Sequence, residues 1–220
     1  MTQEELKQIL EQHKLWLDDS TKGSRANLRD ANFIYKANLI GADLREADLW
    51  GANLSGADLS GAKLRWADLR YADLRYADLR EAKLENAHLS EANLKGADLR
   101  GAYLQEADLR GAYLQEADLY MANLRGADLR GAYLEGANLK GTDLSGADLS
   151  WADLSGVDLS GVDLEWADLT GANLRRAKLR RAKLRWADLR KANFECADLS
   201  GADLEWAKTK GAILDESTKF

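Results

Sequence analysis

Few side chains in this sequence could carry out catalysis or hold a metal ion. The two histidines, His13 and His88, lie far apart in the chain, and neither has a cysteine or a second histidine at the spacing of a metal site. Cys196 is the only cysteine, and no histidine stands beside it to activate its thiol. The glycines do not match the spacing of a phosphate-binding loop. These residues predict no catalytic site, no metal site and no cofactor, so we interpret the protein as non-enzymatic.

Carboxylates are abundant, but they recur too regularly to form a single catalytic cluster. Catalysis needs unlike groups that converge in a pocket, whereas most aspartates here directly precede a leucine at five-residue steps. Acidic residues exceed basic ones, and the net charge is −6. Our default interpretation is that the carboxylates form solvated faces that keep the protein soluble.

The spacing comes from a five-residue unit, Ala-(Asp/Asn)-Leu-x-x, that runs from Ala37 to Trp206. Its centres fall at every fifth residue from Leu39 to Leu204, with Phe194 as the one replacement. Such a step would rotate leucine by about 140° around a helix, and would alternate leucine between the two faces of a strand. The pattern therefore predicts a coil that bends between units, with every leucine pointing to a common axis. Alanine lies two residues before the centre except at Thr142, Val157 and Val162.

The units at 42–46, 57–61 and 127–131 read Ala-Asp-Leu-Arg-Glu, Ala-Asp-Leu-Ser-Gly and Ala-Asp-Leu-Arg-Gly, and they resemble the pentapeptide repeat family. The resemblance covers residues 26–214. It implies an all-β solenoid, a right-handed quadrilateral β-helix with four units per coil, in which the central residue and the small residue two before it face inward. A recurrence of tryptophan at twenty-residue steps agrees with four units per coil, whereas the nine-residue segment beginning at Gly101 recurs after ten.

We expect three parts along the chain. Residues 1–24 form an N-terminal helix and link, 25–214 the β-helix of pentapeptide repeats, and 215–220 a C-terminal tail. One extra residue falls within 34–36 and predicts a bulge in the first coil. With coils about 4.8 Å apart, the regular rod should be about 41 Å long.

The N-terminal segment predicts a short capping α-helix over about residues 3–17. Thr2 and Glu5 have the spacing of a capping box, and apolar residues follow at helical intervals. We expect this helix to cover the first coil, with His13 on its apolar side as a contact; the alternative is a docking helix for a partner. The side chains expected to close the opposite end are Ile213, Leu214 and Phe220.

Composition favours a soluble, cytoplasmic protein. The mean hydropathy is −0.47 and 31% of residues are charged. No apolar run approaches the length of a membrane span, and the first ten residues are too acidic and polar for a signal peptide. A single cysteine excludes an intramolecular disulfide and suits a reducing compartment.

Four-sided wrapping would gather three sets of outward residues near the C-terminal end. They are an aspartate column, a tryptophan column and a basic belt between Arg175 and Lys191. Together they form the candidate interaction surface, represented by Asp148, Asp168, Asp188, Trp166, Trp186, Trp206, Arg176, Arg180 and Arg181.

Each set has a structural and a functional interpretation. Stacked tryptophans shield the backbone, or they form a binding patch whose main version is a homodimer through the C-terminal end. The belt forms salt bridges with the acidic columns, or it contacts nucleic acid or another anionic surface. We favour the structural interpretation of both and expect no direct nucleic-acid binding.

The sequence therefore predicts a structural or protein-interaction scaffold with an unknown protein partner. The alternative is a DNA-mimicking binder of DNA gyrase or another DNA-binding protein, because some members of the family imitate DNA. A net charge of −6 along about 41 Å is sparse beside one charge per about 1.7 Å in DNA. The basic belt and the leucine centres also argue against mimicry.

Overall fold

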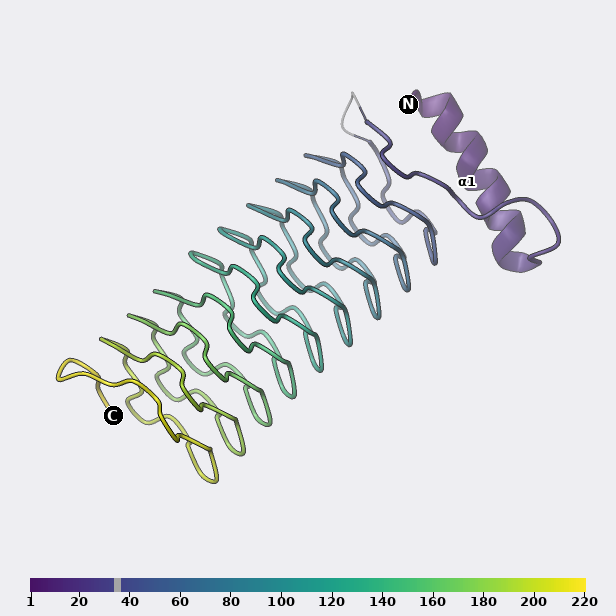
Figure 1. The fold of residues 1–220 in the computed structure, drawn as a ribbon. Coiled ribbons are helices and arrows are strands. Elements are labelled where there is room, and N and C mark those ends of the chain that lie inside the picture. The colour runs from purple at the N-terminus through teal and green to yellow at the C-terminus, as the bar shows by residue number, and fades with distance from the viewer. Residues whose placement is uncertain (34–36) are drawn as a thin grey trace.

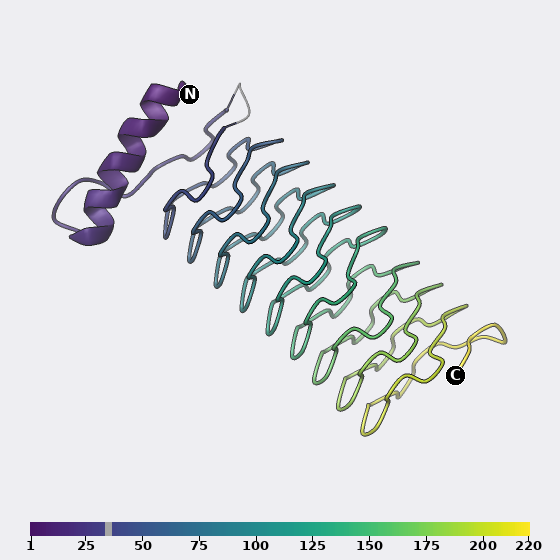
Figure 2. The same ribbon diagram turned by 180° about the vertical axis from the view of Figure 1, so that it is seen from behind.

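The computed structural model describes residues 1–33 and 37–220. The chain begins with the helix α1 (Gln3–Asp18) and then winds into a rod of stacked coils. The helix lies at one end of the rod and the C-terminus at the other (Figures 1 and 2). The fold is the right-handed quadrilateral β-helix that the family resemblance implied, with the short helix that the N-terminal segment predicted.

Single-residue parallel bridges hold the coils together. The residue before each centre pairs with the residue twenty positions later, as in the series Asp48, Asp68 and His88. The Leu49 amide donates to the Asp68 carbonyl at 2.8 Å, and the Asp68 amide donates to the Ala47 carbonyl at 2.9 Å. A twenty-residue step between paired residues means four units per coil, as the family resemblance implied.

A β-turn makes each corner of the coil. In the unit centred on Leu39, the Ala42 amide donates to the Leu39 carbonyl at 3.0 Å. The third residue of the turn, Gly41, has a φ of 61°, the left-handed conformation that glycine adopts without a steric penalty. The same position is held by Trp66 in a later coil, with the same φ of 61°. Non-glycine residues at these corners are therefore strained, by about 1–2 kcal/mol each.

The core consists of the leucine and alanine columns, as predicted. Leu109 is 1% exposed and Ala107 is fully buried, and Phe194 fits the same column with 2% exposure. Each buried leucine stabilises the fold by about 1.5–3 kcal/mol relative to an exposed one. The rod is therefore stabilised along its whole length by one repeated contact.

Among the described residues, the backbone bridges between coils are interrupted at one place, which we call the seam. The bridge that a twenty-residue step requires between Asn138 and Asp158, both described, is not formed, and the Leu139 amide has no backbone acceptor. Two β-branched residues, Val157 and Val162, replace alanine in the coil that should pair here and are 1% exposed. The seam therefore coincides with the extra methyl groups of these two residues.

Helix α1 covers the N-terminal end of the rod. Its capping box is formed, with the Glu5 amide donating to Thr2 Oγ1 at 3.2 Å and the Thr2 amide donating to Glu5 Oε2 at 2.8 Å. His13 is fully buried, and its Nδ1 accepts a hydrogen bond from the Ala26 amide at 3.0 Å. The predicted contact of His13 with the first coil is confirmed.

Both ends depart from the twenty-residue register by one position. Asn27 pairs with Asp48, twenty-one residues later, which requires one extra residue in the first coil. The bulge expected within 34–36 itself lies outside the described residues. A second extra residue, which the sequence analysis missed, precedes Lys219, because Lys219 pairs with Asp198 rather than with a residue twenty positions before it. The final coil therefore continues past residue 214 through this bridge.

The expectation that apolar side chains close the C-terminal end is wrong. Ile213 is 49% exposed, Leu214 50% and Phe220 71%. A residue in the middle of the rod is covered by the coils on both sides, whereas these three have a coil on one side only. The two ends of the described rod are thus unlike, one covered by α1 and the other open.

Candidate interaction surfaces

The outward aspartates and asparagines first serve the backbone. Oδ1 of Asp148 accepts a hydrogen bond from the Ser150 amide at 3.0 Å, and Oδ1 of Asp168 accepts from the Thr170 amide at 2.8 Å. This Asx-type turn recurs along the rod, and only a short side chain with an acceptor oxygen can make it. Sequence reasoning treated these carboxylates as solvated and missed this role, although Asp or Asn fills this position in most units and was a visible signal.

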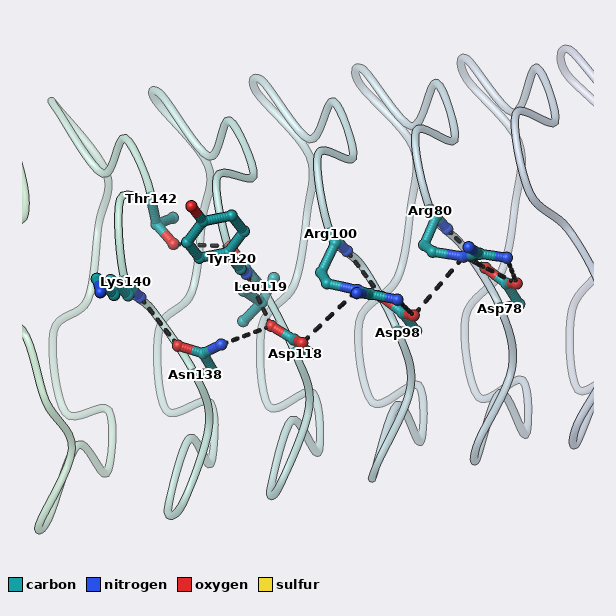
Figure 3. Close-up of polar contacts among 10 residues, drawn as sticks. All are labelled: Asp78, Arg80, Asp98, Arg100, Asp118, Leu119, Tyr120, Asn138, Lys140 and Thr142. Atoms are coloured by element: carbon teal, nitrogen blue, oxygen red, sulfur yellow. Dashed lines mark hydrogen bonds and ion pairs between the residues drawn. The ribbon is translucent and has the colours of Figure 1, made fainter.

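Arginines then link the carboxylates of one side into a ladder along the rod (Figure 3). Arg80 pairs with Asp78 of its own unit, and its Nε lies 3.7 Å from Asp98 Oδ2 of the next coil. Arg100 repeats the arrangement, 2.6 Å from Asp98 and 3.7 Å from Asp118. Charges of opposite sign therefore alternate along this side.

This ladder of arginine–aspartate ion pairs ends at Asp118, one coil before the seam. Asn138 Nδ2 donates to Asp118 Oδ1 at 2.8 Å, and no arginine follows it in this column until Arg180. Beside it, Thr142 Oγ1 donates to the Leu119 carbonyl at 2.8 Å, so the buried hydroxyl is satisfied (Figure 3).

The opposite side carries the aspartate column of the candidate surface. Arg110 and Arg130 link Asp108, Asp128 and Asp148, with Arg130 Nε 3.6 Å from Asp148 Oδ2. Further along, two of the candidate residues differ. Asp188 is buried and meets Arg190 at 2.7 Å and Lys208 at 3.5 Å, whereas Asp168 has no cation within ion-pair distance among the described residues.

Arginine partners lower the pKa of Asp78 and Asp188. A hydrogen bond from Arg80 is the main cause for Asp78, and one from Arg190 for Asp188, in each case against a smaller opposing effect of burial. Ser200, with help from Arg180, lowers the pKa of Asp198 to about 2. These three carboxylates therefore stay charged at neutral or mildly acidic pH, and a nearby arginine matches the charge of each.

Charge is segregated beyond the seam. No lysine or arginine occurs in residues 141–174, which carry a run of carboxylates, and the basic belt follows in the next coil. Salt bridges join the two: Lys183 Nζ lies 3.0 Å from Asp163 Oδ2, and Lys178 Nζ lies 3.9 Å from Asp158 Oδ2. Residues of the belt with a carboxylate partner are Arg175, Lys178, Arg180, Lys183, Arg185 and Arg190.

Three members of the belt have no such partner. Arg176, Arg181 and Lys191 are exposed and are paired with no carboxylate of the described residues. All three occupy the third position of a corner turn, with positive φ. The structure therefore separates Arg180, which meets Asp198 at 2.7 Å, from its neighbour Arg181.

The tryptophan column divides in the same way. Trp166 and Trp186 stack with ring centroids 4.7 Å apart and planes within 8° of parallel, and Arg185 lies 4.7 Å above the Trp186 ring. Trp206 is 68% exposed, and its indole Nε1 donates to Glu205 at 3.1 Å. The first two tryptophans stack on each other, although Trp166 is still 62% exposed, whereas Trp206 lies beside the open end and stacks on no other aromatic ring of the described residues.

The open end also presents unpaired backbone. The amides of Leu204, Trp206 and Leu214 donate to no acceptor among the described residues, whereas equivalent amides inside the rod donate to the following coil. Around them lie the exposed side chains of Ile213, Leu214 and Phe220. Such an edge, with apolar side chains and free amides, is a template for another chain.

Hollows on the surface are shallow. One of about 700 Å³ lies over the corner turns and is lined by Ser160, Gly161, Arg180, Arg181, Ser200 and Gly201. Another of about 540 Å³ lies between α1 and the first coil, lined in part by Leu10, Leu17 and Ala42.

Within residues 1–33 and 37–220, no three His, Cys, Asp or Glu side chains are placed to hold a metal ion. In that same part of the chain, no helix is long and apolar enough to cross a membrane.

Comparison with known proteins gives a consistent picture. A family model described as pentapeptide repeats matches residues 34–70, 72–111, 92–131, 122–161 and 158–195 with eight copies. The chain is 38% identical to HetL of Nostoc sp. strain PCC 7120, a pentapeptide repeat protein involved in heterocyst differentiation regulation, over 81% of this chain and 89% of that one, with a TM-score of 0.49.

Two other solved structures match the chain at lower identity. A trypsin-treated form of QnrB1, a plasmid-mediated fluoroquinolone resistance protein, is 23% identical over 87% of this chain and 91% of that one, with a TM-score of 0.39. Rfr23 from the cyanobacterium Cyanothece 51142 is 29% identical over 63% of each chain, with a TM-score of 0.24. The comparison with curated protein sequences gave no match.

Proposed function

Because the chain belongs to the pentapeptide repeat family, we propose that it is a non-enzymatic scaffold that binds other proteins, and that it pairs with a second copy of itself through the C-terminal end. The supporting observation is the contrast between the two ends. Helix α1 covers one, and the other exposes Leu214, Phe220 and free backbone amides. A second copy placed end to end would pair those amides and bury those side chains.

The regular sides support a scaffold rather than an enzyme. Most outward carboxylates are engaged by the amide two residues later or by an arginine, and the hollows between them are open and shallow. Catalytic groups need an enclosed site where unlike groups converge. A rod of this kind instead presents long, regular faces and one end with exposed apolar side chains and free backbone amides.

Sedimentation equilibrium tests the pairing. The double variant Leu214→Asp/Phe220→Asp places charges in the proposed interface and should convert a dimer into a monomer. Met121→Asp is the matched control, because Met121 is 61% exposed but lies in the middle of the rod. The proposal predicts a dimer for the wild type and the control. A wild-type monomer at about 100 μM, or an unchanged dimer in the double variant, would contradict it.

Substitution of the tryptophans near the open end gives a second test of the dimer. Replacing Trp186 and Trp206 with serine should weaken the dimer if the column extends the interface, since Trp206 adjoins the open end. An unchanged dimer would restrict the interface to the apolar end itself.

DNA mimicry is the second candidate function. The straight carboxylate columns and the cation-free stretch of residues 141–174 favour it. The arginine ladders weaken it, because Arg80, Arg100 and Arg130 each neutralise an aspartate of such a column. A DNA gyrase supercoiling assay decides: mimicry requires inhibition or protection at micromolar protein, and the scaffold proposal predicts no effect.

A further inference from the structure

We propose that one side of the basic belt binds an extended acidic segment of a partner protein, which specifies a partner for the scaffold function proposed above. This side, the basic face, consists of Arg175, Arg176, Lys178, Arg180 and Arg181. They are outward residues of one coil and span two successive corner turns. Lys178 pairs through the backbone with Asp198 of the next coil and with Asp158 of the preceding one.

The basic face has unused hydrogen-bonding capacity. Three of its cations have partners: Arg175 lies 3.1 Å from Glu195, Lys178 3.9 Å from Asp158 and Arg180 2.7 Å from Asp198. Arg176 and Arg181 have no carboxylate partner among the described residues and lie at the two corners. Each guanidinium carries five donors that match carboxylate geometry. The face is therefore bracketed by two cations free to bind an anion.

The surroundings leave room for a ligand beside both arginines. Arg181 lies between Gly161 and Gly201 in the corner column, and neither glycine has a side chain that could cover it. The hollow there, about 700 Å³, also exposes Ser160 and Ser200. Beside Arg176, a hollow of about 300 Å³ is lined by Ser155, Gly156, Asn173, Arg175 and one carboxylate, that of Glu135. Hydroxyl and amide groups thus supplement the arginines on either side of the face.

The width of the face selects the kind of partner. The cations occupy a single coil, about 4.8 Å from its neighbours, whereas the major groove of DNA alone is about 12 Å wide. A nucleic-acid duplex would therefore also press its phosphates on Asp158 and Asp198 in the adjoining coils. An extended peptide has the width of one strand and can follow the coil. Acidic side chains on such a segment would reach Arg176 and Arg181 at the two corners, while Asp158 and Asp198 keep their ion pairs with Lys178 and Arg180.

Fluorescence anisotropy of a fluorescein-labelled octaglutamate peptide at low salt tests this. The variant Arg176→Gln/Arg181→Gln should weaken binding by about tenfold or more, because it removes the two free charge-assisted donors. The control is Arg65→Gln/Arg125→Gln. Arg65 and Arg125 are also exposed and have no carboxylate partner among the described residues, and the change in net charge is the same. The control should bind within about twofold of the wild type.

Three outcomes would overturn the proposal. One is equal weakening in both variants, which means attraction by net charge alone. Another is no binding to the wild type at about 1 mM peptide. The last is tighter binding of a twelve-base-pair DNA duplex than of the peptide, which assigns the face to nucleic acid. Sedimentation of the same variants separates this proposal from the dimer: if the peptide result fails while the dimer persists, only the basic face is reassigned.

Discussion

The aspartate before the centre of a unit has two structural roles, and substitution can separate them. In Asp78, one oxygen accepts the Arg80 amide at 3.1 Å, and the carboxylate also pairs with the Arg80 guanidinium. Asparagine can do the first but not the second. The same column contains Asn38 and Asn138, whose side-chain oxygens accept amides at 3.2 and 3.3 Å. Asn38 and Asn138 therefore keep the turn without the charge.

Asp78→Asn should therefore change the free energy of unfolding by less than about 0.5 kcal/mol, because exposed ion pairs contribute little. Asp78→Ala should cost about 1 kcal/mol, since it leaves the turn amide without its acceptor. Urea unfolding of the two variants measures both. Equal losses in the two variants would show that the ion pair, and not the turn, is the stabilising contact.

The pH dependence has a definite sign. Because Arg80 lowers the pKa of Asp78 below its ordinary 3.8, the fold favours the charged form. That stabilisation is complete above pH 3.8 and is lost as the pH falls through the lowered pKa of the folded state. Asp78→Asn should remove this part of the acid sensitivity.

At the scale of elements, the cap on the N-terminal end depends on a neutral histidine. Burial lowers the pKa of His13, against the opposing effects of the Arg45 carbonyl and of Asp43. Nδ1 is already an acceptor for the Ala26 amide, so protonation would break that hydrogen bond. The other charged groups near it are Arg45 and Glu46 of the first coil.

Acidification should therefore loosen α1. A lowered histidine pKa contributes stability above the ordinary value of 6.5 and loses it as the pH falls towards the folded-state value. Hydrogen exchange of the α1 amides, corrected for intrinsic rates, should show declining protection below pH 6.5. His13→Gln cannot titrate, and its exchange should lack this dependence. The same pH profile in both proteins would rule out His13 as the cause.

The seam is the second element with a testable cause. If the methyl groups of Val157 and Val162 keep the coils apart, Val157→Ala/Val162→Ala should let the Leu139 amide find its acceptor on Asp158. Its hydrogen exchange should slow by about tenfold or more, the effect of one added hydrogen bond of about 1–1.5 kcal/mol. The reciprocal variant Ala97→Val/Ala102→Val should open a seam at the Leu79 amide. Unchanged exchange in both would locate the cause elsewhere.

At the scale of the whole molecule, the fold followed from the sequence more fully than the surfaces did. The Leu and Ala columns fix the axis and the inward faces, and the family resemblance supplied the four-unit coil. The backbone role of the aspartates, the pairing of arginines such as Arg80 and Arg100, and the seam depend on contacts between residues twenty apart. A five-residue pattern contains no direct record of those contacts.

The expectation that the C-terminal end is closed was wrong for a related reason. Ile213, Leu214 and Phe220 look like closing residues because they are apolar, but closure needs something beyond them to pack against. The exposed end gives the rod a direction: α1 blocks stacking at one end, and the other remains adhesive. Pairing through the open end alone gives a closed dimer rather than a filament.

Distances between spin labels test this polarity most directly. The native Cys196 is exposed and lies one coil from the open end, so it can be labelled without substitution. Electron–electron double resonance should place the Cys196 labels of the two copies within about 40 Å of each other. Labels at position 22, introduced by Lys22→Cys in a Cys196→Ser background, should lie about 80 Å apart, which is twice the rod length. No coupling between Cys196 labels, or a shorter distance at position 22, would contradict the account.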